Sequence, residues 1–235
     1  MISINNIDKF YKKKLRKTHV FKDFSLELKG PGIIGLLGEN GIGKTTLLKM
    51  IADLSSPVQG NITIDDAKVS RHTRDKVSYL LASEHLAGYM SVKNAVSFFE
   101  DFFPDFDEEK CKDLIKTFNI DLESKITKLS KGYKERVCLM LCLSRNTDYY
   151  ILDEPMAGFD PKFKKDIVTA LLSYVKPHQT IIISTHLLKD LESLFDTIVV
   201  LKKNNAIVKT AEEIRESGIS IENYYLEVVG DENVS

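Results

Sequence analysis

The sequence contains no tryptophan and only three cysteines among its 235 residues. The cysteines, Cys111, Cys138 and Cys142, form no C-x-x-C pattern. An odd number of cysteines without that spacing argues against a disulfide framework and for a reducing, cytosolic setting. No apolar stretch approaches the roughly 18 to 20 residues that a membrane-spanning helix needs, and we find no signal peptide. We therefore expect a chain that is soluble by itself.

An excess of charge of either sign is also missing. Lys and Arg together number 33, Asp and Glu together number 34, and the formal net charge is -1. This balance gives no global attraction to a polyanion, so we expect no nucleic-acid partner. What the sequence does contain is 43% apolar residues, enough for the full core of one domain with an inserted or appended lobe.

The stretch from Ile33 to Leu48 changes from an apolar run to a glycine-rich loop and then to a helical pattern. Its spacing, G-x-x-x-x-G-K-T, is that of a phosphate-binding P-loop, whose glycines let backbone N–H groups turn toward an anion. In this interpretation Lys44 reaches the outer phosphates, Thr45 places its hydroxyl on Mg²⁺, and Thr46 bonds an inner phosphate. A glycine-rich turn without a ligand would not require strand, loop and helix in this order.

Two further apolar strands are expected to end in reactive side chains. Residues 149–152 lead into Asp153 and Glu154, and residues 180–185 lead into His186. Beside a P-loop strand, Asp153 can hold the Mg²⁺ shell while Glu154 orients and polarises the water that attacks the γ-phosphate. A lone histidine is more often structural, but the carboxyl end of a parallel strand is where open α/β sheets bind ligands.

The amino-terminal residues 1–29 alternate as edge strands do and predict two or three antiparallel strands. The strands are joined by the basic segment 12–17, for which a solvated hairpin tip is favoured over contact with anionic lipid headgroups. Just before this segment, Tyr11 carries a ring that can stack on a nucleotide base. On the residues alone, core packing explains Tyr11 almost as well.

The whole pattern predicts an α/β fold: a P-loop NTPase core with a mixed sheet, an N-terminal antiparallel β subdomain and an inserted helical subdomain. We expect the core at about 1–84 and 147–210, the helical subdomain at about 85–146, and a short C-terminal extension at about 211–235. Four insertion phenylalanines cover too wide an arc for one buried stripe. They fit packing inside the helical lobe and, less readily, an aromatic surface for a partner helix. These are Phe98, Phe99, Phe102 and Phe103.

In this order the motifs resemble those of the ATP-binding cassette (ABC) ATPases that power membrane transporters, over roughly residues 2–208. Residues 38–46 resemble the Walker A motif, and residues 149–154 resemble Walker B with its catalytic glutamate. Residues 129–133, Leu-Ser-Lys-Gly-Tyr, resemble the LSGGQ signature, and residues 157–160 resemble the D-loop. The resemblance implies that ATP is bound by Tyr11, Gly38, Asn40, Gly41, Gly43, Lys44, Thr45 and Thr46. It implies that Thr45 and Asp153 are the Mg²⁺ ligands and that Glu154 and the switch histidine, His186, are the catalytic residues. It also implies that the signature residues Ser130, Lys131 and Gly132 act in trans and that Asp160 is the D-loop residue.

The resemblance also implies a mechanism and partners. Two cassettes, in a homodimer or a heterodimer, would meet head to tail, with each ATP between the Walker A of one and the signature of the other. Hydrolysis would remove the contacts that hold the closed dimer, and opening would follow by population shift. The cycle would drive a separate polytopic membrane subunit, which would place this chain peripherally at the cytoplasmic face of the cell membrane.

The single cassette and its signature are most similar to ATPase subunits of bacterial two-component (ABC-2 type) exporters. The resemblance implies an exported cargo such as an antimicrobial or cytolytic peptide or a drug. The alternative is a soluble stand-alone cassette acting on a cytosolic machine.

The sequence departs from the family pattern at two places. The glutamine of the family's Q-loop aligns with Ala82, which can bond neither Mg²⁺ nor a water, and Glu84 is a candidate replacement by proximity. Lys131 and Tyr133 stand where the signature most often has glycine and glutamine. We expect Ala82→Gln to change the ATPase rate or the nucleotide affinity, and an unaltered enzyme would make Ala82 a bystander.

Overall fold

The structure is a computed structural model that describes residues 1–13, 16–80 and 82–230. Its strands form two sheets, one of four antiparallel strands in the order β2-β1-β4-β5 and one of six strands in the order β10-β9-β3-β8-β7-β6. The second sheet is mixed, because β10 runs antiparallel to β9 while the other neighbours are parallel. The predicted α/β class with a mixed sheet and an antiparallel β subdomain is confirmed. The strands are β1 Ile2–Lys13, β2 Arg16–Leu28, β3 Gly32–Leu37, β4 Gln59–Ile64, β5 Ala67–Lys68, β6 Val77–Tyr79, β7 Tyr149–Asp153, β8 Thr180–Ser184, β9 Thr197–Lys202 and β10 Asn205–Thr210.

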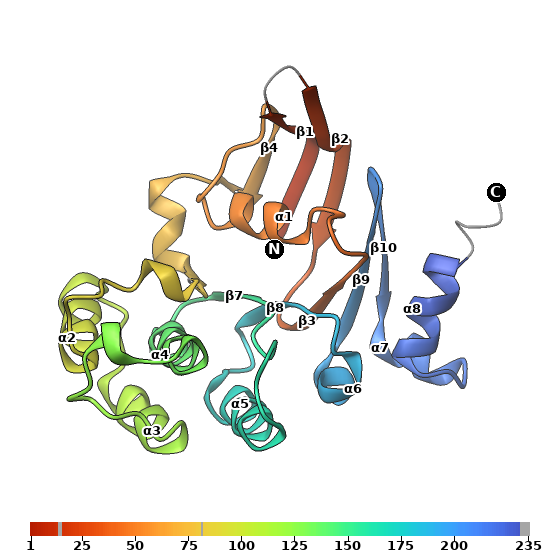
Figure 1. Ribbon diagram of the computed structural model, residues 1–235. Coiled ribbons are helices and arrows are strands. Elements are labelled where there is room, and N and C mark those ends of the chain that lie inside the picture. Colours follow the sequence, from red (N-terminus) through yellow and green to blue (C-terminus); the bar gives the residue numbers. More distant parts are fainter. Residues whose placement is uncertain (14–15, 81, 231–235) are drawn as a thin grey trace.

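The helices form layers around the sheets. Figure 1 shows α1 between the two sheets and α4, α5 and α6 on the other face of the six-stranded sheet. The α-helices are α1 Lys44–Ile51, α2 Val92–Phe102, α3 Glu108–Thr117, α4 Lys131–Leu143, α5 Pro161–Tyr174, α6 Leu188–Leu191, α7 Ala211–Glu216 and α8 Ile221–Gly230, and the 3₁₀ turns are η1 Arg71–Lys76, η2 Ser83–His85, η3 Ile126–Lys128 and η4 Glu192–Leu194.

Strand β8 shows how one sheet separates two cores. All five of its residues are buried, as expected for a central parallel strand that is covered on both faces. Its side chains alternate, so Ile181 and Ile183 face the helices while Ile182 faces α1 and the antiparallel sheet. Because the central strands are buried on both faces, the residues at their ends are held in fixed positions.

The strand register brings the predicted site residues to that edge. Strand β8 pairs with β3 on one side and with β7 on the other, and Ser184 lies opposite Leu36 in one pairing and Asp153 in the other. The P-loop follows β3, Glu154 follows β7 and His186 follows β8. Because parallel strands end at a common edge, three segments far apart in sequence meet there.

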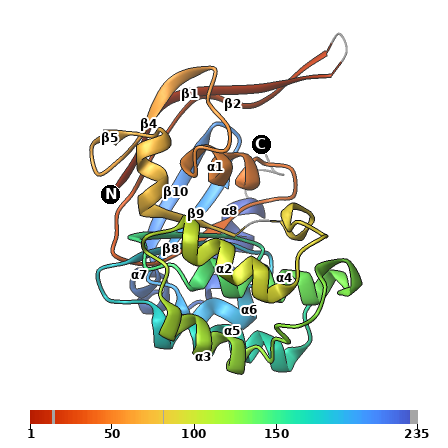
Figure 2. The ribbon, with the colours of Figure 1, turned by 90° about the vertical axis from the view of Figure 1, so that its left-hand side faces the viewer.

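The antiparallel sheet carries a long hairpin. Strands β1 and β2 pair from Ile2 with Leu28 to Lys13 with Arg16, and Figure 2 shows them extending beyond the rest of the molecule. The hairpin tip predicted in the basic segment lies at residues 14 and 15, outside the described residues. Its two interpretations therefore stay predictions.

The insertion contains α2, α3 and α4, which lie together in Figures 1 and 2. The four phenylalanines of α2 and its end divide between two environments. Phe99 and Phe103 are half-buried, whereas Phe98 and Phe102 are 48% and 65% exposed and stack on each other at 5.6 Å between ring centroids. Packing inside the helical lobe thus accounts for only one of the two pairs. The proposed division into core, helical subdomain and extension stays a prediction.

The chain after β10 forms α7 and α8, which pack on α6 and β10. Helix α7 starts with a capping box, in which the Thr210 hydroxyl accepts from the Glu213 N–H and the Glu213 carboxylate accepts from the Thr210 N–H. Ile214 and Ile221 are buried in the core. None of the described helices is both long and apolar enough to span a bilayer.

Candidate functional site

The P-loop occupies the turn between β3 and α1. Gly43 forms the N-cap of α1 with φ 119°, and a Cβ atom there would lie 2.8 Å from the Phe21 ring, so glycine is required on both grounds. Gly38 has φ 152°, and a Cβ there would lie 2.8 Å from the Leu201 carbonyl oxygen. No side chain caps α1. Its first-turn N–H groups are therefore left without a side-chain acceptor, as an anion site requires.

Lys44 lies against this loop and is only 8% exposed. Its ammonium donates hydrogen bonds to the carbonyl oxygens of Gly38 at 2.6 Å and Glu39 at 3.2 Å. Burial lowers the pKa of Lys44, and the charges of Glu154 and Asp153 partly offset that shift. The ammonium is thus held inside the curve of the loop, next to the position where the glycines would cradle phosphate. The other predicted loop residues, Asn40, Gly41 and Thr45, are exposed.

Asp153 ends β7 and is fixed by the neighbouring strand. The Ser184 hydroxyl donates to one Asp153 carboxylate oxygen and accepts a hydrogen bond from the Glu154 N–H. Asp153 and the exposed Thr45 line the same cavity. No cluster of three or more His, Cys, Asp or Glu side chains suited to a metal occurs in the described part of the chain. One carboxylate and one hydroxyl nevertheless fit Mg²⁺, which commonly takes few protein ligands and completes its shell with water and phosphate oxygens.

Glu154 and His186 face each other across the ends of β7 and β8. His186 Nδ1 lies 2.9 Å from Glu154 Oε2. That oxygen is shielded from solvent and accepts no aligned hydrogen bond from the described residues, so the contact with the histidine is one of proximity. Glu154 also has φ 50°, an uncommon conformation for a side-chain-bearing residue. The backbone is held there by its N–H bonds to the Ser184 carbonyl and hydroxyl oxygens.

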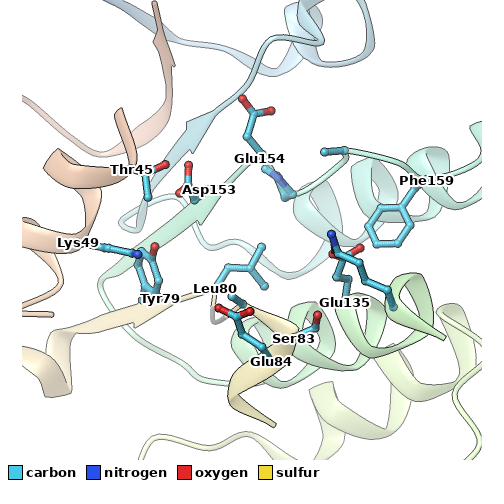
Figure 3. A pocket seen from close by; sticks show the side chains of 14 residues that line it. Thr45, Lys49, Tyr79, Leu80, Ser83, Glu84, Glu135, Asp153, Glu154 and Phe159 are labelled. Atoms are coloured by element: carbon cyan, nitrogen blue, oxygen red, sulfur yellow. Dashed lines mark ion pairs between the residues drawn. The ribbon is translucent and has the colours of Figure 1, made fainter. Parts of the chain in front are cut away.

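A cavity of about 360 Å³ opens beside these groups. Figure 3 shows Thr45, Asp153 and Glu154 on the side of the core, and Ser83, Glu84 and Glu135 on the side of the helical lobe. Ala82, the N-cap of η2, lines the same cavity. Both residues that the sequence associates with the Q-loop, Ala82 and Glu84, therefore border the space next to the predicted Mg²⁺ ligands.

Tyr11, on β1, lies near the first turn of α1. Its ring is 49% exposed, and its hydroxyl is 3.4 Å from the Thr46 hydroxyl. Core packing therefore does not account for Tyr11. The exposed ring beside Thr46 is consistent with the predicted stacking on a nucleotide base.

The residues predicted as the signature lie at the start of α4. Ser130 is its N-cap, and its hydroxyl accepts a hydrogen bond from the Tyr133 N–H at 3.2 Å. Ser130 and Lys131 are exposed, and the Lys131 ammonium is 3.8 Å from Glu135 in the next turn. Tyr133 points into its own lobe, where its hydroxyl accepts from the Asp121 N–H at 2.6 Å.

Asp160, predicted to belong to a D-loop, bonds to two helices. Its carboxylate caps α5 by accepting hydrogen bonds from the Lys162 and Phe163 N–H groups, both at 3.0 Å. It also accepts a hydrogen bond at 2.9 Å from Arg136, on the signature helix α4. The capping bonds lower the pKa of Asp160, and Arg136 adds to the shift.

Two residues of this arrangement escaped the sequence interpretation. Ser184 was hidden in the apolar run of β8, although a polar residue that ends a buried strand beside a Walker B strand is a usable signal. Arg136 had no signal, because its contact with Asp160 depends on how α4 packs beside α5.

The comparisons with known proteins agree with this geometry. A family model described as "ABC transporter" matches residues 21–157. The ABC transporter ATP-binding protein YtrB of Bacillus subtilis is 29% identical over 89% of this chain and 73% of its own length. The Nod factor export ATP-binding protein I of Burkholderia orbicola is 30% identical over 89% of this chain and 70% of its own.

Among solved structures, the fold is similar to that of the ATP-binding cassette MJ0796, described as a dimer in a post-hydrolysis state bound to ADP and Pi. The two structures superpose with a TM-score of 0.78, at 20% identity, over 90% of this chain and 99% of that one.

Proposed function

This chain belongs to the ABC transporter family of ATPases, and we propose that it is the ATP-hydrolysing subunit of a membrane exporter. In this proposal Lys44 and the loop N–H groups hold the phosphates of ATP. Thr45 and Asp153 hold Mg²⁺, which would supply charge neutralisation at the transferring phosphate. The ring of Tyr11 stacks on the base.

The observation that carries the proposal is the placement of Glu154. The Glu154 side chain is 28% exposed and lines the cavity that Thr45 and Asp153 also border, so its carboxylate is placed to accept a proton from an attacking water there. His186, 2.9 Å away, would hold the γ-phosphate and orient the carboxylate. The chain supplies these groups from one edge of the sheet, where phosphate and water can meet.

The other half of the site is proposed to come from a second cassette. Ser130 and Lys131 are exposed at the N-terminus of α4, and Gly132 beside them leaves the backbone accessible. A helix N-terminus favours an anion, so this turn suits the γ-phosphate bound by a partner. The dimeric state described for the MJ0796 cassette supports the arrangement.

The test is Glu154→Gln, which keeps the size of the side chain and removes the base. We expect turnover to fall at least about a hundredfold, as loss of a general base does, while ATP still binds. We expect a closed dimer to accumulate in ATP, measured by light scattering, because the contacts of the γ-phosphate are no longer removed. Glu227→Gln on the exposed face of α8 is the control. A variant that stays monomeric in ATP contradicts the two-cassette site.

The membrane partner and the cargo form the outer part of the proposal. The similarity to an ATP-binding protein named for Nod factor export supports an export role. We propose a separate polytopic subunit that holds this chain at the cytoplasmic face of the membrane, and a peptide or drug as cargo. A tagged chain purified in mild detergent from its native host should bring down a polytopic protein without a cassette of its own. An active ATPase that copurifies with no membrane protein would contradict the export role.

A further inference from the structure

The segment that follows His186 is held by the C-terminal helices. We propose that α7 and α8 position the switch histidine, with Glu192 as the positioning residue through which they act. This inference rests on the catalytic role proposed for His186 and Glu154. It assigns to the tail a function in turnover that requires no contact with nucleotide.

The side chain of His186 does little to fix its own position. It is 58% exposed, so packing does not confine the ring. Its backbone is held instead, because the preceding Thr185 is buried and accepts a hydrogen bond from the Leu187 N–H at 2.9 Å. Directly after Leu187 the chain enters α6, whose Leu188 and Leu191 are buried. The position of the imidazole therefore depends on where α6 and η4 lie.

Glu192, the first residue of η4, receives bonds from both tail helices. Its Oε1 accepts a hydrogen bond at 2.7 Å from the N–H of Ile221, at the start of α8. Its backbone carbonyl accepts another at 3.0 Å from the Arg215 guanidinium, on α7. The same guanidinium donates to the Phe195 carbonyl at 3.3 Å, so Arg215 bonds to the first residue of η4 and to the residue that follows it. Figure 1 shows α6, α7 and α8 grouped at the blue end of the chain.

The polar contacts of the α6 residues Lys189 and Asp190 couple the tail to this segment less strongly than those of Glu192. Lys189 and Glu222 form an ion pair at 3.4 Å, but the lysine is 78% exposed, and solvent screens such pairs strongly. Asp190 pairs with Lys164 of α5 at 2.6 Å, which anchors α6 to the core rather than to the tail. The carboxylate of Glu192 lies at the N-terminus of α8, where a negative charge is also favoured by the helix dipole. It is therefore the side-chain contact through which the tail acts most directly.

A small shift of α6 is expected to affect the chemistry more than the binding. The hydrogen bonds of Lys44 go to the loop carbonyls of Gly38 and Glu39, whereas those of Glu192 go to α7 and α8. A displaced imidazole would misalign Glu154 and the γ-phosphate, and misplacement by about 1 Å can cost a large factor in rate. The expected signature is a lower kcat with an unchanged KM for ATP.

The test is Glu192→Ala, with two companions. We expect kcat to fall about fivefold, the effect of one lost hydrogen bond, with KM within a factor of about two. Glu192→Gln keeps an oxygen that can accept from the Ile221 N–H, so we expect it to restore most of kcat. Glu216→Ala removes an exposed carboxylate of α7 that makes no hydrogen bond or ion pair with the described residues, and we expect no change.

The controls separate this inference from the function on which it rests. If His186→Ala lowers kcat while Glu192→Ala does not, the tail has no positioning role and the catalytic proposal stands. If His186→Ala leaves kcat unchanged, the catalytic proposal itself fails. A Glu192→Gln variant as slow as Glu192→Ala would also overturn the inference, since the acceptor oxygen would then not matter.

Discussion

The N-termini of α1 and α4 are two candidate anion sites that are built differently. Helix α1 begins after Gly43 with no side-chain cap, and its Lys44 is buried against the loop carbonyls. Helix α4 begins after Ser130, whose hydroxyl caps the first turn, and its Lys131 is exposed. No side-chain cap satisfies a first-turn N–H group of α1, whereas in α4 the Ser130 hydroxyl satisfies the Tyr133 N–H.

The different helix starts of α1 and α4 suit two different roles in binding an anion. An uncapped first turn with a buried ammonium suits the phosphate binding that we propose within one chain, and glycines with positive φ keep side chains out of the loop. A capped and exposed first turn stays folded without its ligand, as a surface must when it waits for the nucleotide of a partner. The hydroxyl of Ser130 can do both, because it accepts from the Tyr133 N–H and still has a proton to donate.

Removing the lysine of the first site should have the largest effect. We expect Lys44→Ala to raise the Kd for ATP at least about a hundredfold, because two or more charge-assisted bonds to phosphate are lost. Nucleotide titration by fluorescence measures the change. Lys203→Ala, in the exposed turn after β9, is the matched control. Retained micromolar-range affinity would show that α1 does not depend on its lysine.

The cap of the second site offers a matched pair of variants. Ser130 caps α4 and Ser91 caps α2, each accepting a backbone N–H at 3.2 Å. Ser130→Ala and Ser91→Ala should each cost about 1 kcal/mol of stability, measured by thermal or denaturant unfolding. We expect only Ser130→Ala to lower turnover, by about tenfold, because only its hydroxyl would also serve a phosphate. Equal turnover in the two variants would show that Ser130 only caps α4 and does not serve a phosphate.

The same contrast explains what could be predicted from the sequence. The P-loop can be recognised from a short stretch of sequence. The spacing of Gly38 and Gly43 indicates backbone angles that only glycine adopts freely, and Lys44 follows directly. Strand polarity was readable too, since apolar runs ending in Asp153 or His186 identify strands that deliver groups to one edge. The confirmed fold class follows from these local signals.

What escaped prediction depends on register and packing. Ser184 binds Asp153 only because β8 pairs with β7 in one particular register. Arg136 reaches Asp160 only because α4 and α5 pack side by side in the folded chain. Neither relation leaves a fixed spacing in sequence. The exposed ring of Tyr11 beside Thr46 likewise became distinguishable from a core aromatic only in three dimensions.

Tyr133, in the first turn of α4, is expected to have the smallest effect on turnover. If this residue served a partner's nucleotide, its hydroxyl would be directed outward, but it donates to the Asn119 carbonyl at 3.0 Å and accepts from the Asp121 N–H. We therefore expect Tyr133→Phe to cost about 1 kcal/mol of stability and to leave kcat unchanged. Tyr89→Phe, with a side chain that is 83% exposed, should change neither quantity. A slower Tyr133→Phe enzyme of unchanged stability would place the hydroxyl at the phosphate instead, and the first turn of α4 would then depend on its partner as α1 depends on its ligand.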